Sequence, residues 1–288
     1  MNPYIQSLRL RTLPLSMSGI ILGTGLAFNG QWSTISGRMW LVFALAILTT
    51  LSLQILSNLS NELGDALKGT DAEQQERVAY GLQSGAITTT QMRQMIGLFI
   101  GLSMLFGTTL IWAAFGTLLC VQSLVFLGLG ALAIMGAMTY TLGKHSYGYM
   151  GLGDLGVFVF FGLLSTMGAY WLQTQTMTIE VTVAAVAIAL PIVGVLNLNN
   201  IRDMQNDRLH GKRTFASLLG PTGGRIYHLL LIVGCLALFA AIGHLWPLLI
   251  LPVWAWHLWY VWTHTERLDI QMPVLMFTTL IVAILACI

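Results

Sequence analysis

Long stretches without a charged residue limit what this chain can fold into more than any other feature. Arg93 and Lys144 enclose 50 uncharged residues, and Arg225 and Glu266 enclose 40. Only 8% of the 288 residues are charged and 56% are hydrophobic, whereas soluble domains carry about 25% charged residues. An ordinary water-soluble enzyme is therefore excluded, because a surface this apolar can be covered only by lipid.

The charge-free intervals also predict the membrane spans, since a helix needs about 20 apolar residues to cross a bilayer core. Each of the two longest intervals has room for two helices, with a turn near 115–117 in one and a break near 244–247 in the other. The remaining intervals hold one helix each. We predict an all-α membrane protein with nine transmembrane helices, lying within 12–37, 39–61, 94–143 (two), 155–179, 181–201, 226–265 (two) and 270–288.

The distribution of Lys and Arg predicts the orientation of these spans. With the connections numbered alternately, 12 of the 13 basic residues lie on the side of the N-terminus, and only Arg38 lies opposite. Cytoplasmic loops are enriched in Lys and Arg, so the N-terminus is predicted to be cytoplasmic and the C-terminus to lie outside. Arg9 and Arg11 precede an apolar stretch that is longer than a usual signal-peptide core and has no clear cleavage site, so it is expected to be the first span.

The acidic residues gather on the same side as the basic ones. Ten of the 11 lie there, with Glu180 alone across the membrane. Carboxylates contribute little to orientation, so something other than topology has brought them together.

Two polar motifs follow the second and the sixth predicted spans. Each has three residues spaced i, i+3, i+7 on one helix face: Asn58, Asn61 and Asp65 in the first motif, and Asn200, Asp203 and Asp207 in the second. Glu62 lies beside the first set. The shared pattern Asn-(Glu/Asn)-x-x-Asp indicates a weak internal duplication, and it predicts two carboxylate clusters that face each other at one edge of the bundle.

Opposed carboxylates and amides suit a divalent cation and a polyphosphate. Mg²⁺ prefers oxygen ligands and is usually held by one or two carboxylates together with substrate phosphates. Basic side chains can take the remaining phosphate charge, and six flank the motifs: Lys68, Arg77, Arg202, Arg208, Lys212 and Arg213. The alternative is that these loops are merely solvated and that Asn and Asp cap helix ends. Two motifs with equal spacing on the same side favour the metal and phosphate interpretation.

Other residue types give no sign of a site. The three cysteines lie far apart with no second ligand at metal spacing, so neither a disulfide framework nor a zinc site is indicated. A net charge of +2 gives no reason to expect a nucleic-acid partner. The 30 glycines predict close helix packing. Single histidines and a run of tryptophans are expected to lie at the membrane interface: His228, His244, His257, His264, Trp254, Trp256, Trp259 and Trp262.

At these motifs the sequence resembles the UbiA superfamily of intramembrane aromatic prenyltransferases. The similarity covers nearly the whole chain and lies in four ordered blocks: residues 8–15 (LRLRTLPL), residues 53–59 leading into the first motif, Tyr140-Thr141 with 147–154, and the second motif with 211–214. The third block and the GxD ending of the first motif are most similar to the menaquinone-pathway subgroup. Two departures are Glu62, where the family usually has Asp, and residues 78–80 after Arg77.

The resemblance implies a fold and an activity. It implies one UbiA-like prenyltransferase domain over residues 1–288, a nine-helix bundle whose central cavity opens sideways to lipid, in the cytoplasmic (inner) membrane with its active site at the cytoplasmic edge. The implied reaction, with Mg²⁺ as cofactor, moves a polyprenyl group from polyprenyl diphosphate to 1,4-dihydroxy-2-naphthoate. Carbon dioxide and diphosphate are lost and demethylmenaquinone is formed. The implied partners are these substrates and membrane lipid, with no nucleic acid.

Residue roles follow from the matched positions. The implied Mg²⁺ ligands are Asn61, Glu62, Asp65, Asp71, Asn199, Asn200, Asp203 and Asp207. The implied diphosphate contacts are Arg9, Asn58, Lys68, Arg202 and Lys212. The implied catalytic residues are Asp65, Lys68, Tyr140, Asp154 and Asp203, with Lys144 and Tyr147 around the reacting groups.

Two alternatives stay open at this point. Within the family, the acceptor could be 4-hydroxybenzoate, homogentisate, haem or a chlorophyllide. From another class, the chain could be a cation-coupled transporter, but transporters usually place such groups at the bilayer midplane in broken helices. The position of these motifs at one membrane edge favours the enzyme.

Overall fold

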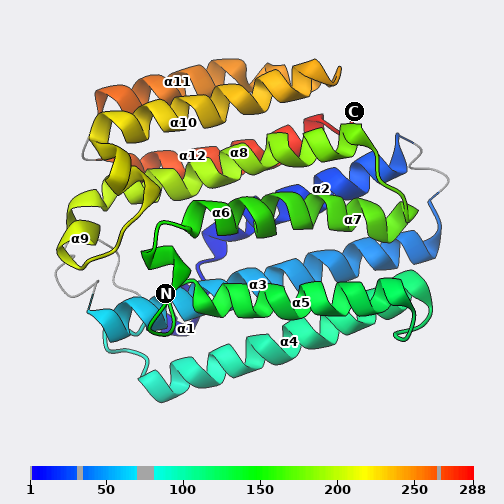
Figure 1. Cartoon of the computed structure of the whole chain (residues 1–288), viewed down its shortest axis with the longest axis horizontal. Helices are drawn as coiled ribbons and strands as arrows, with labels where there is room; N and C mark the ends of the chain where they lie inside the picture. The colour runs from blue at the N-terminus through cyan, green and yellow to red at the C-terminus, as the bar shows by residue number, and fades with distance from the viewer. Residues whose placement is uncertain (1, 31–34, 70–80, 265–266) are drawn as a thin grey trace.

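The protein is a bundle of helices that lie side by side along one long axis (Figure 1). The computed structural model describes residues 2–30, 35–69, 81–264 and 267–288. Within these ranges every regular element is a helix, and the only β-type pairing is an isolated bridge between Met150 and Arg213. The predicted all-α class is therefore confirmed.

The described residues form twelve α-helices and several shorter helical turns. The α-helices are α1 (Pro3–Ser7), α2 (Leu13–Phe28), α3 (Gly37–Lys68), α4 (Thr89–Phe115), α5 (Val121–Thr139), α6 (Gly153–Val157), α7 (Ser165–Thr174), α8 (Ile179–Arg202), α9 (Met204–Leu209), α10 (Phe215–Ala241), α11 (Leu251–Thr263) and α12 (Gln271–Leu285). The shorter turns are η1 (Leu10–Thr12), η3 (Tyr147–Tyr149), η5 (Trp246–Ile250) and η6 (Leu268–Ile270). A π-helical segment, η4 (Phe158–Leu164), joins α6 to α7 without a break.

Seven helical segments of the described chain are long and apolar enough to cross a membrane. They correspond to predicted spans two to seven and nine: Gly37–Lys68, Thr89–Phe115, Val121–Thr139, Gly153–Thr174, Ile179–Arg202, Phe215–Ala241 and Leu268–Leu285. The other two predicted spans contain shorter helices, α2 with 16 residues and α11 with 13. The predicted break after Phe115 is confirmed, since Gly116 ends α4 with a φ of 73°. The break near 244–247 is confirmed as well.

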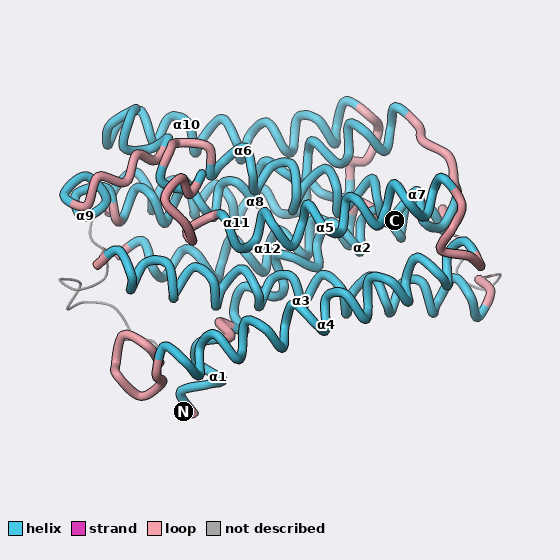
Figure 2. The backbone as a smooth tube through the Cα atoms, turned by 60° about the horizontal axis from the view of Figure 1, so that its bottom comes forward, coloured by secondary structure: helices cyan, strands magenta, loops and turns pink. Residues whose placement is uncertain are grey.

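Two helix groups enclose the centre of the bundle. α3, α4 and α5 pack together on one side, and α8, α10, α11 and α12 on the other, with α2 and α6–α7 between them (Figure 1). Figure 2 shows that the loops gather at the two ends of the bundle. Helices approach closely where glycine lacks a Cβ atom, as predicted: an added Cβ at Gly162 would lie 2.1 Å from the Cβ of Ala189 on α8.

The few charges at the end opposite the two motifs have structural partners. Arg38 donates a hydrogen bond of 2.9 Å from Nε to the carbonyl of Ala113 and another to the carbonyl of Ala114, at the carboxyl end of α4. A cation there also balances the helix dipole. Glu180 pairs with His244 over 2.8 Å, and the other ring nitrogen of His244 bonds the carbonyl of Ala286. These charges therefore hold helix ends together.

The interfacial placement predicted for two histidines and one tryptophan is wrong. His228 and His257 are buried with their Nε2 atoms 2.8 Å apart, and His257 Nδ1 lies 2.8 Å from Oε1 of Gln271. Trp254 is buried and donates to Thr278 Oγ1 over 2.8 Å. The packing of α11 against α10 and α12 encloses these side chains, which periodicity within one helix does not reveal. The remaining tryptophans of the run are exposed: Trp256, Trp259 and Trp262.

The contact of α2 with α7 gives a test of the packing. An added Cβ at Gly23 would lie 2.1 Å from the backbone oxygen of Thr166, so the two helices would have to separate. We expect Gly23→Ala to lower the free energy of unfolding by about 1–3 kcal/mol, seen as a lower midpoint of thermal unfolding in detergent. Gly101→Ala on α4, where nothing lies within 4 Å of the added atom, is the control and should not lower the midpoint, since Ala favours the helix over Gly. An unaltered midpoint in Gly23→Ala would contradict this packing.

Candidate active site

The first polar motif lies at the carboxyl end of α3. With 32 residues, α3 is about 48 Å long, which exceeds the roughly 30 Å hydrocarbon core of a bilayer. Its last turns can therefore carry polar groups beyond the lipid. Asn58 donates from Nδ2 to the carbonyl of Leu8 over 2.9 Å and to Thr12 Oγ1 over 3.0 Å. This amide fixes the N-terminal segment onto α3, while Asn61, one turn later, lines the central cavity.

Asp65 is held by a tyrosine from a distant loop. Tyr149 donates its hydroxyl to Asp65 Oδ1 over 2.8 Å. The Nζ atom of Lys68 lies 3.7 Å from the centre of the Tyr149 ring and donates to Ser146 Oγ. A cation over a tyrosine ring is stabilised by the charge distribution of the ring. The loop between α5 and α6 therefore positions both charged groups at the end of α3.

The second motif begins where α8 ends. Arg202 binds both carboxylate oxygens of Asp203, from Nε at 2.8 Å and from Nη2 at 2.9 Å. Its other donors contact Asn199 Oδ1 at 3.1 Å, Met272 Sδ at 3.6 Å and the carboxylate of Asp269. A guanidinium has five N–H donors, and these contacts engage all of them. Arg202 thus fixes the positions of Asp203 and Asn199.

Asp207 and Lys212 complete the second motif. Asp207, in the short helix α9, is buried, and its Oδ1 lies 3.3 Å from Lys212 Nζ. The backbone reinforces the pair, because the amide of Lys212 donates to the carbonyl of Asp207 over 2.8 Å. Next to it, the amide of Arg213 donates to the carbonyl of Tyr149 over 3.1 Å. The loop after α9 and the loop after α5 are therefore joined.

Tyr149 connects the two motifs. Lys68 from the first and Lys212 from the second both approach its ring, with Nζ at 3.7 and 5.6 Å from the centre. The same side chain bonds Asp65, while Lys212 pairs with Asp207. The arrangement brings two cations and the carboxylates of both motifs to one end of the bundle. Cations and carboxylates close together can take a diphosphate and a divalent cation.

Two further tyrosines stand beside this cluster. Tyr140 and Tyr147 meet edge to face with ring centres 5.3 Å apart, and both line the cavity. Burial raises the pKa of Tyr140 above its ordinary value, and the negative charge of Asp154 raises it further. Burial also raises the pKa of Tyr147 to about 12, and its hydroxyl donates to the carbonyl of Gly136 over 3.0 Å. Both phenols therefore stay protonated at neutral pH. Asp154 itself binds the hydroxyl of Tyr227.

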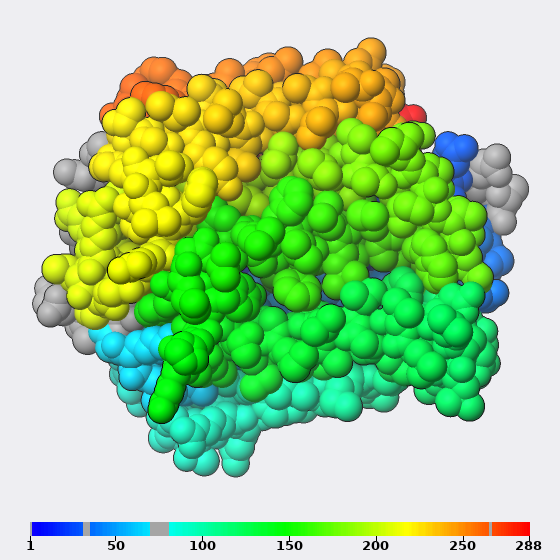
Figure 3. Space-filling view, in the orientation of Figure 1, coloured from blue at the N-terminus to red at the C-terminus, as the bar shows by residue number. Residues whose placement is uncertain are grey.

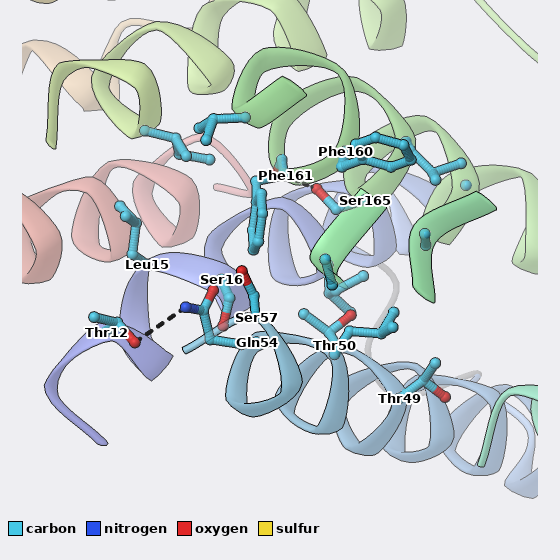
Figure 4. Close-up of a pocket in the computed structure, with 18 of the residues that line it drawn as sticks. Thr12, Leu15, Ser16, Thr49, Thr50, Gln54, Ser57, Phe160, Phe161 and Ser165 are labelled. Atoms are coloured by element: carbon cyan, nitrogen blue, oxygen red, sulfur yellow. Dashed lines mark hydrogen bonds between the residues drawn. The ribbon is translucent and has the colours of Figure 1, made fainter. Parts of the chain in front are cut away.

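A cavity of about 310 Å³ lies within the bundle, lined by Tyr140 and Tyr147 but not by Asp65, Lys68, Tyr149 or Lys212. Its polar end is lined by Arg9, Asn58, Asn61, Tyr140 and Asn199. Most of the remaining wall is apolar, and Figure 4 shows Leu15, Phe160 and Phe161 on it. Binding sites for small molecules are commonly apolar with a few placed polar groups, and this cavity has that composition.

The cavity continues into a groove on the outside of the bundle. The groove lies between α5 and the η4–α7 segment, where the surface is hollowed (Figure 3). Five residues line both spaces: Phe126, Leu129, Phe160, Leu164 and Gly168. The groove wall is almost entirely apolar, which suits a hydrocarbon chain. This geometry agrees with the sideways opening that the family resemblance implies.

Several predicted site residues have other surroundings. Glu62 does not line the cavity: it accepts from the backbone amide of Leu82 over 2.8 Å and from Ser7 Oγ over 3.3 Å. Arg202 was predicted to contact phosphate, but its donors are engaged with protein groups. Asn200 is buried in α8 and is not part of the cavity lining. Lys144 is exposed. The predictions for Asp71 and Arg77 lie outside the described residues.

The oxygen donors suit a magnesium ion. Asn61 Oδ1 is buried and accepts no hydrogen bond from any described residue, and both Asn61 and Asn199 line the cavity. Among the described residues, no three His, Cys, Asp or Glu side chains stand close enough to hold a metal by themselves. Mg²⁺ usually completes its coordination with substrate phosphates and water. The residues present therefore fit a magnesium ion that binds together with a diphosphate.

The structure brings to the site several residues for which no role was predicted. Tyr149 and Ser146 contact Lys68 from a loop 78 or more positions away, a separation that helix periodicity cannot bridge. Gln54 and Ser57 could have been found, because they are polar residues inside an apolar span and share a helix face with Asn61 and Asp65. Both line the cavity.

Residues 16–281 match the model of the UbiA prenyltransferase family. The chain belongs to this family. It is 42% identical to a protein of Escherichia coli named 1,4-dihydroxy-2-naphthoate octaprenyltransferase, over 82% of this chain and 75% of that protein. A protein of the same name from Haemophilus influenzae is 41% identical, over 79% of this chain and 72% of its own length. The resemblance seen in the sequence is confirmed.

Solved structures show the same fold. A UbiA homolog from Archaeoglobus fulgidus bound to GPP and Mg²⁺ has a TM-score of 0.67 and 14% identity, with 99% of this chain and 98% of that chain covered. The apo structure of a UbiA homolog from Aeropyrum pernix has a TM-score of 0.59 and 18% identity, covering 96% and 97%. Together with the apolar helices, family membership makes this an integral membrane protein.

The contact between Tyr149 and Asp65 gives a direct test of the cluster. Tyr149→Phe removes the hydroxyl that holds Asp65 and keeps the ring beneath the lysines. Loss of a hydrogen bond to a charged group should lower kcat/KM for prenyl transfer about tenfold or more, measured with purified enzyme in detergent. Tyr4→Phe, at an exposed tyrosine near the N-terminus, should leave it unchanged. Equal activity of the Tyr149 variant and wild type would rule out this role.

Proposed function

We propose that this chain transfers a polyprenyl group from polyprenyl diphosphate to 1,4-dihydroxy-2-naphthoate, with loss of carbon dioxide and diphosphate, giving demethylmenaquinone. The observation that carries the proposal is the 41–42% identity to two proteins named as octaprenyltransferases for this acceptor. An apolar cavity with one charged end supports it, because the two substrates combine a long hydrocarbon with anionic groups.

The diphosphate of the donor is proposed to bind at the cluster around Tyr149. Lys68 and Lys212 would contact its oxygens, and their proximity to one ring supports this role. Arg9 lines the cavity, whereas both N–H groups of Asn58 are engaged with Leu8 and Thr12. Two cations close together favour a ligand that carries several negative charges.

Mg²⁺ is proposed as the cofactor, with Asn61, Asp65, Asn199, Asp203 and Asp207 as the residues around it. Bound together with the diphosphate, it would stabilise the charge that develops on the leaving group. Arg202 is proposed to orient Asp203 and Asn199 through its five contacts. Tyr149 would do the same for Asp65. Glu62, which was predicted as a metal ligand, is proposed to anchor the N-terminal segment and not to bind the metal.

The reaction breaks the bond between the first carbon of the prenyl chain and the diphosphate oxygen. A bond forms between that carbon and the acceptor ring, and the ring carboxylate leaves as carbon dioxide. The apolar cavity would keep water away from the electron-poor prenyl carbon. Tyr140, held protonated by burial and by the charge of Asp154, is proposed to donate a hydrogen bond at the reacting end. Asp154 would keep this part of the site in place.

The placement in the membrane is also proposed. Nine spans would result if α2 and the η5–α11 segment cross the bilayer together with the seven longer segments. The N-terminus and the active site would then lie at the cytoplasmic side of the inner membrane, the C-terminus outside, and lipid around the bundle. The concentration of 12 of 13 basic residues on one side supports this orientation. Residues 1–288 are proposed to form one prenyltransferase domain.

A product assay tests the function directly. Membranes containing the protein are incubated with Mg²⁺, a polyprenyl diphosphate, and either 1,4-dihydroxy-2-naphthoate or 4-hydroxybenzoate, and products are identified by mass spectrometry. We expect a prenylated, decarboxylated naphthoquinol that disappears when EDTA removes the metal. A prenylated benzoate alone would contradict the proposed acceptor, and no product with either would contradict the proposed activity.

The carboxylates of the two motifs are tested by neutral substitutions of the same shape. Asp65→Asn and Asp203→Asn should each abolish Mg²⁺-dependent transfer while leaving the protein folded in the membrane, because each removes a negative charge from the proposed metal site. Glu180→Gln at the opposite end of the bundle is the matched control and should retain activity. Wild-type turnover by either aspartate variant would refute the metal assignment.

A further inference from the structure

One side of the cavity wall carries a group of neutral polar side chains that the charged cluster does not explain. Ser16 of α2 and Gln54 and Ser57 of α3 lie together, and we name these three residues the polar patch. Figure 4 shows them gathered beside Thr12, with the ring of Phe161 facing them from η4. Gln54 and Ser57 precede Asn61 by seven and four residues, so they lie on the same face of α3.

The polar patch keeps hydrogen-bonding capacity that the protein does not use. Gln54 donates from Nε2 to Thr12 Oγ1 over 3.2 Å and to Asn58 Oδ1 over 3.0 Å, which uses both of its N–H groups and leaves Oε1 without a donor among the described residues. Ser57 Oγ has no partner in the described chain. Ser16 lines the cavity and its Oγ donates to the carbonyl of Leu13 over 2.9 Å, so its oxygen can still accept a hydrogen bond. The patch therefore offers acceptors and one free hydroxyl.

A hydrocarbon chain cannot satisfy these groups. Polar atoms enclosed without a partner are unfavourable, and a prenyl tail has no donor or acceptor to offer. Besides the hydroxyls of Thr49, Thr50 and Ser165, the rest of the cavity and the outer groove provide an apolar path for the tail, along Leu110, Ile111, Phe126, Leu129, Leu164 and Leu172. The lining thus divides the cavity into a side that suits the tail and a side that suits a ligand with hydroxyl groups.

We infer that the polar patch binds the ring hydroxyl of the aromatic acceptor that is not adjacent to the carboxylate, and so sets the choice of acceptor. This inference rests on the proposed function. The carboxylate-bearing side of the ring has to face the prenyl carbon near Asn61, so the other hydroxyl points back along α3. Ser57 is about 6 Å from Asn61 along the helix axis, a separation that one aromatic ring can bridge. The ring of Phe161 can stack or pack edgewise on the bound ring.

The hydroxyl would donate to Gln54 Oε1 and accept from Ser57 Oγ. An acceptor without that hydroxyl leaves both patch atoms unpaired, which is how a site built for a hydroxyl rejects an analogue that lacks it. The residues of the patch are specificity-determining and are not needed to break the bond to diphosphate.

Ser57→Ala is the most direct variant, because Ser57 makes no hydrogen bond that folding depends on. With 1,4-dihydroxy-2-naphthoate, we expect its KM for the acceptor to rise about tenfold, the effect of one lost hydrogen bond. Its KM for polyprenyl diphosphate should stay within about twofold of wild type, since the donor lies elsewhere. Ser57→Thr retains a hydroxyl and should recover most of the lost affinity.

A second acceptor separates a direct contact from a general disturbance. With 1-hydroxy-2-naphthoate, which lacks the second hydroxyl, wild type and Ser57→Ala should have the same KM, because the contact that the variant removes is already absent. Ser52→Ala on α3, whose buried hydroxyl donates to Leu48 over 2.8 Å outside the cavity, is the control and should behave as wild type with both acceptors.

Three outcomes would overturn the inference: an unchanged KM for 1,4-dihydroxy-2-naphthoate in Ser57→Ala, an equal rise for both acceptors, or a rise confined to the prenyl donor. The failure of the proposed function is recognised separately, because wild type would then give no prenylated naphthoquinol at all. If wild type does convert the naphthoate, any of these three outcomes contradicts only the proposed role of the polar patch. The proposed function would then still hold.

Discussion

The active end of this bundle depends on one tyrosine that joins two separate parts of the chain. Tyr149 binds Asp65 through its hydroxyl and carries Lys68 and Lys212 near its ring. Two like charges near one ring repel each other, and the nearby carboxylates of Asp65 and Asp207 compensate for this repulsion. The loop holding Tyr149 is fixed in turn by the amide of Arg213. Charged groups contributed by α3 and α9 are therefore in place before any substrate arrives.

Much of the fold and part of the site could be predicted from the sequence. Charge-free intervals located seven membrane-length helices, and the spacing i, i+3, i+7 located the ends of α3 and α8. These signals are local, because they depend on residues within a few turns. The partners of Arg202 include Asp269, 67 positions away, and Glu62 binds the amide of Leu82. Such pairings arise only when helices pack, so the positioning roles of Arg202 and Glu62 were missed, as was the burial of His228 and His257.

Helix α3 contributes to the site along about three turns of one face. Its Gln54, Ser57 and Asn58 line the cavity where the wall is neutral and polar, and Asn61 and Asp65 follow at the charged end. One rigid element thus fixes the spacing between the place for an aromatic ring and the place for a diphosphate. Asn58 also binds the N-terminal segment to this helix, so the residues around Arg9 are held in a fixed position relative to α3.

The π-helical segment η4 gives the opposite wall a shape that a regular helix would not have. Its hydrogen bonds span five residues instead of four, so the segment is wider and turns less per residue. Two consecutive aromatic residues, Phe160 and Phe161, both line the cavity there, while Gly162 packs against Ala189 of α8. Deleting one residue within Phe158–Leu164 would restore α-helical geometry and rotate all of α7 relative to α8. The extra residue therefore determines how far α7 is rotated about its own axis relative to Phe160 and Phe161.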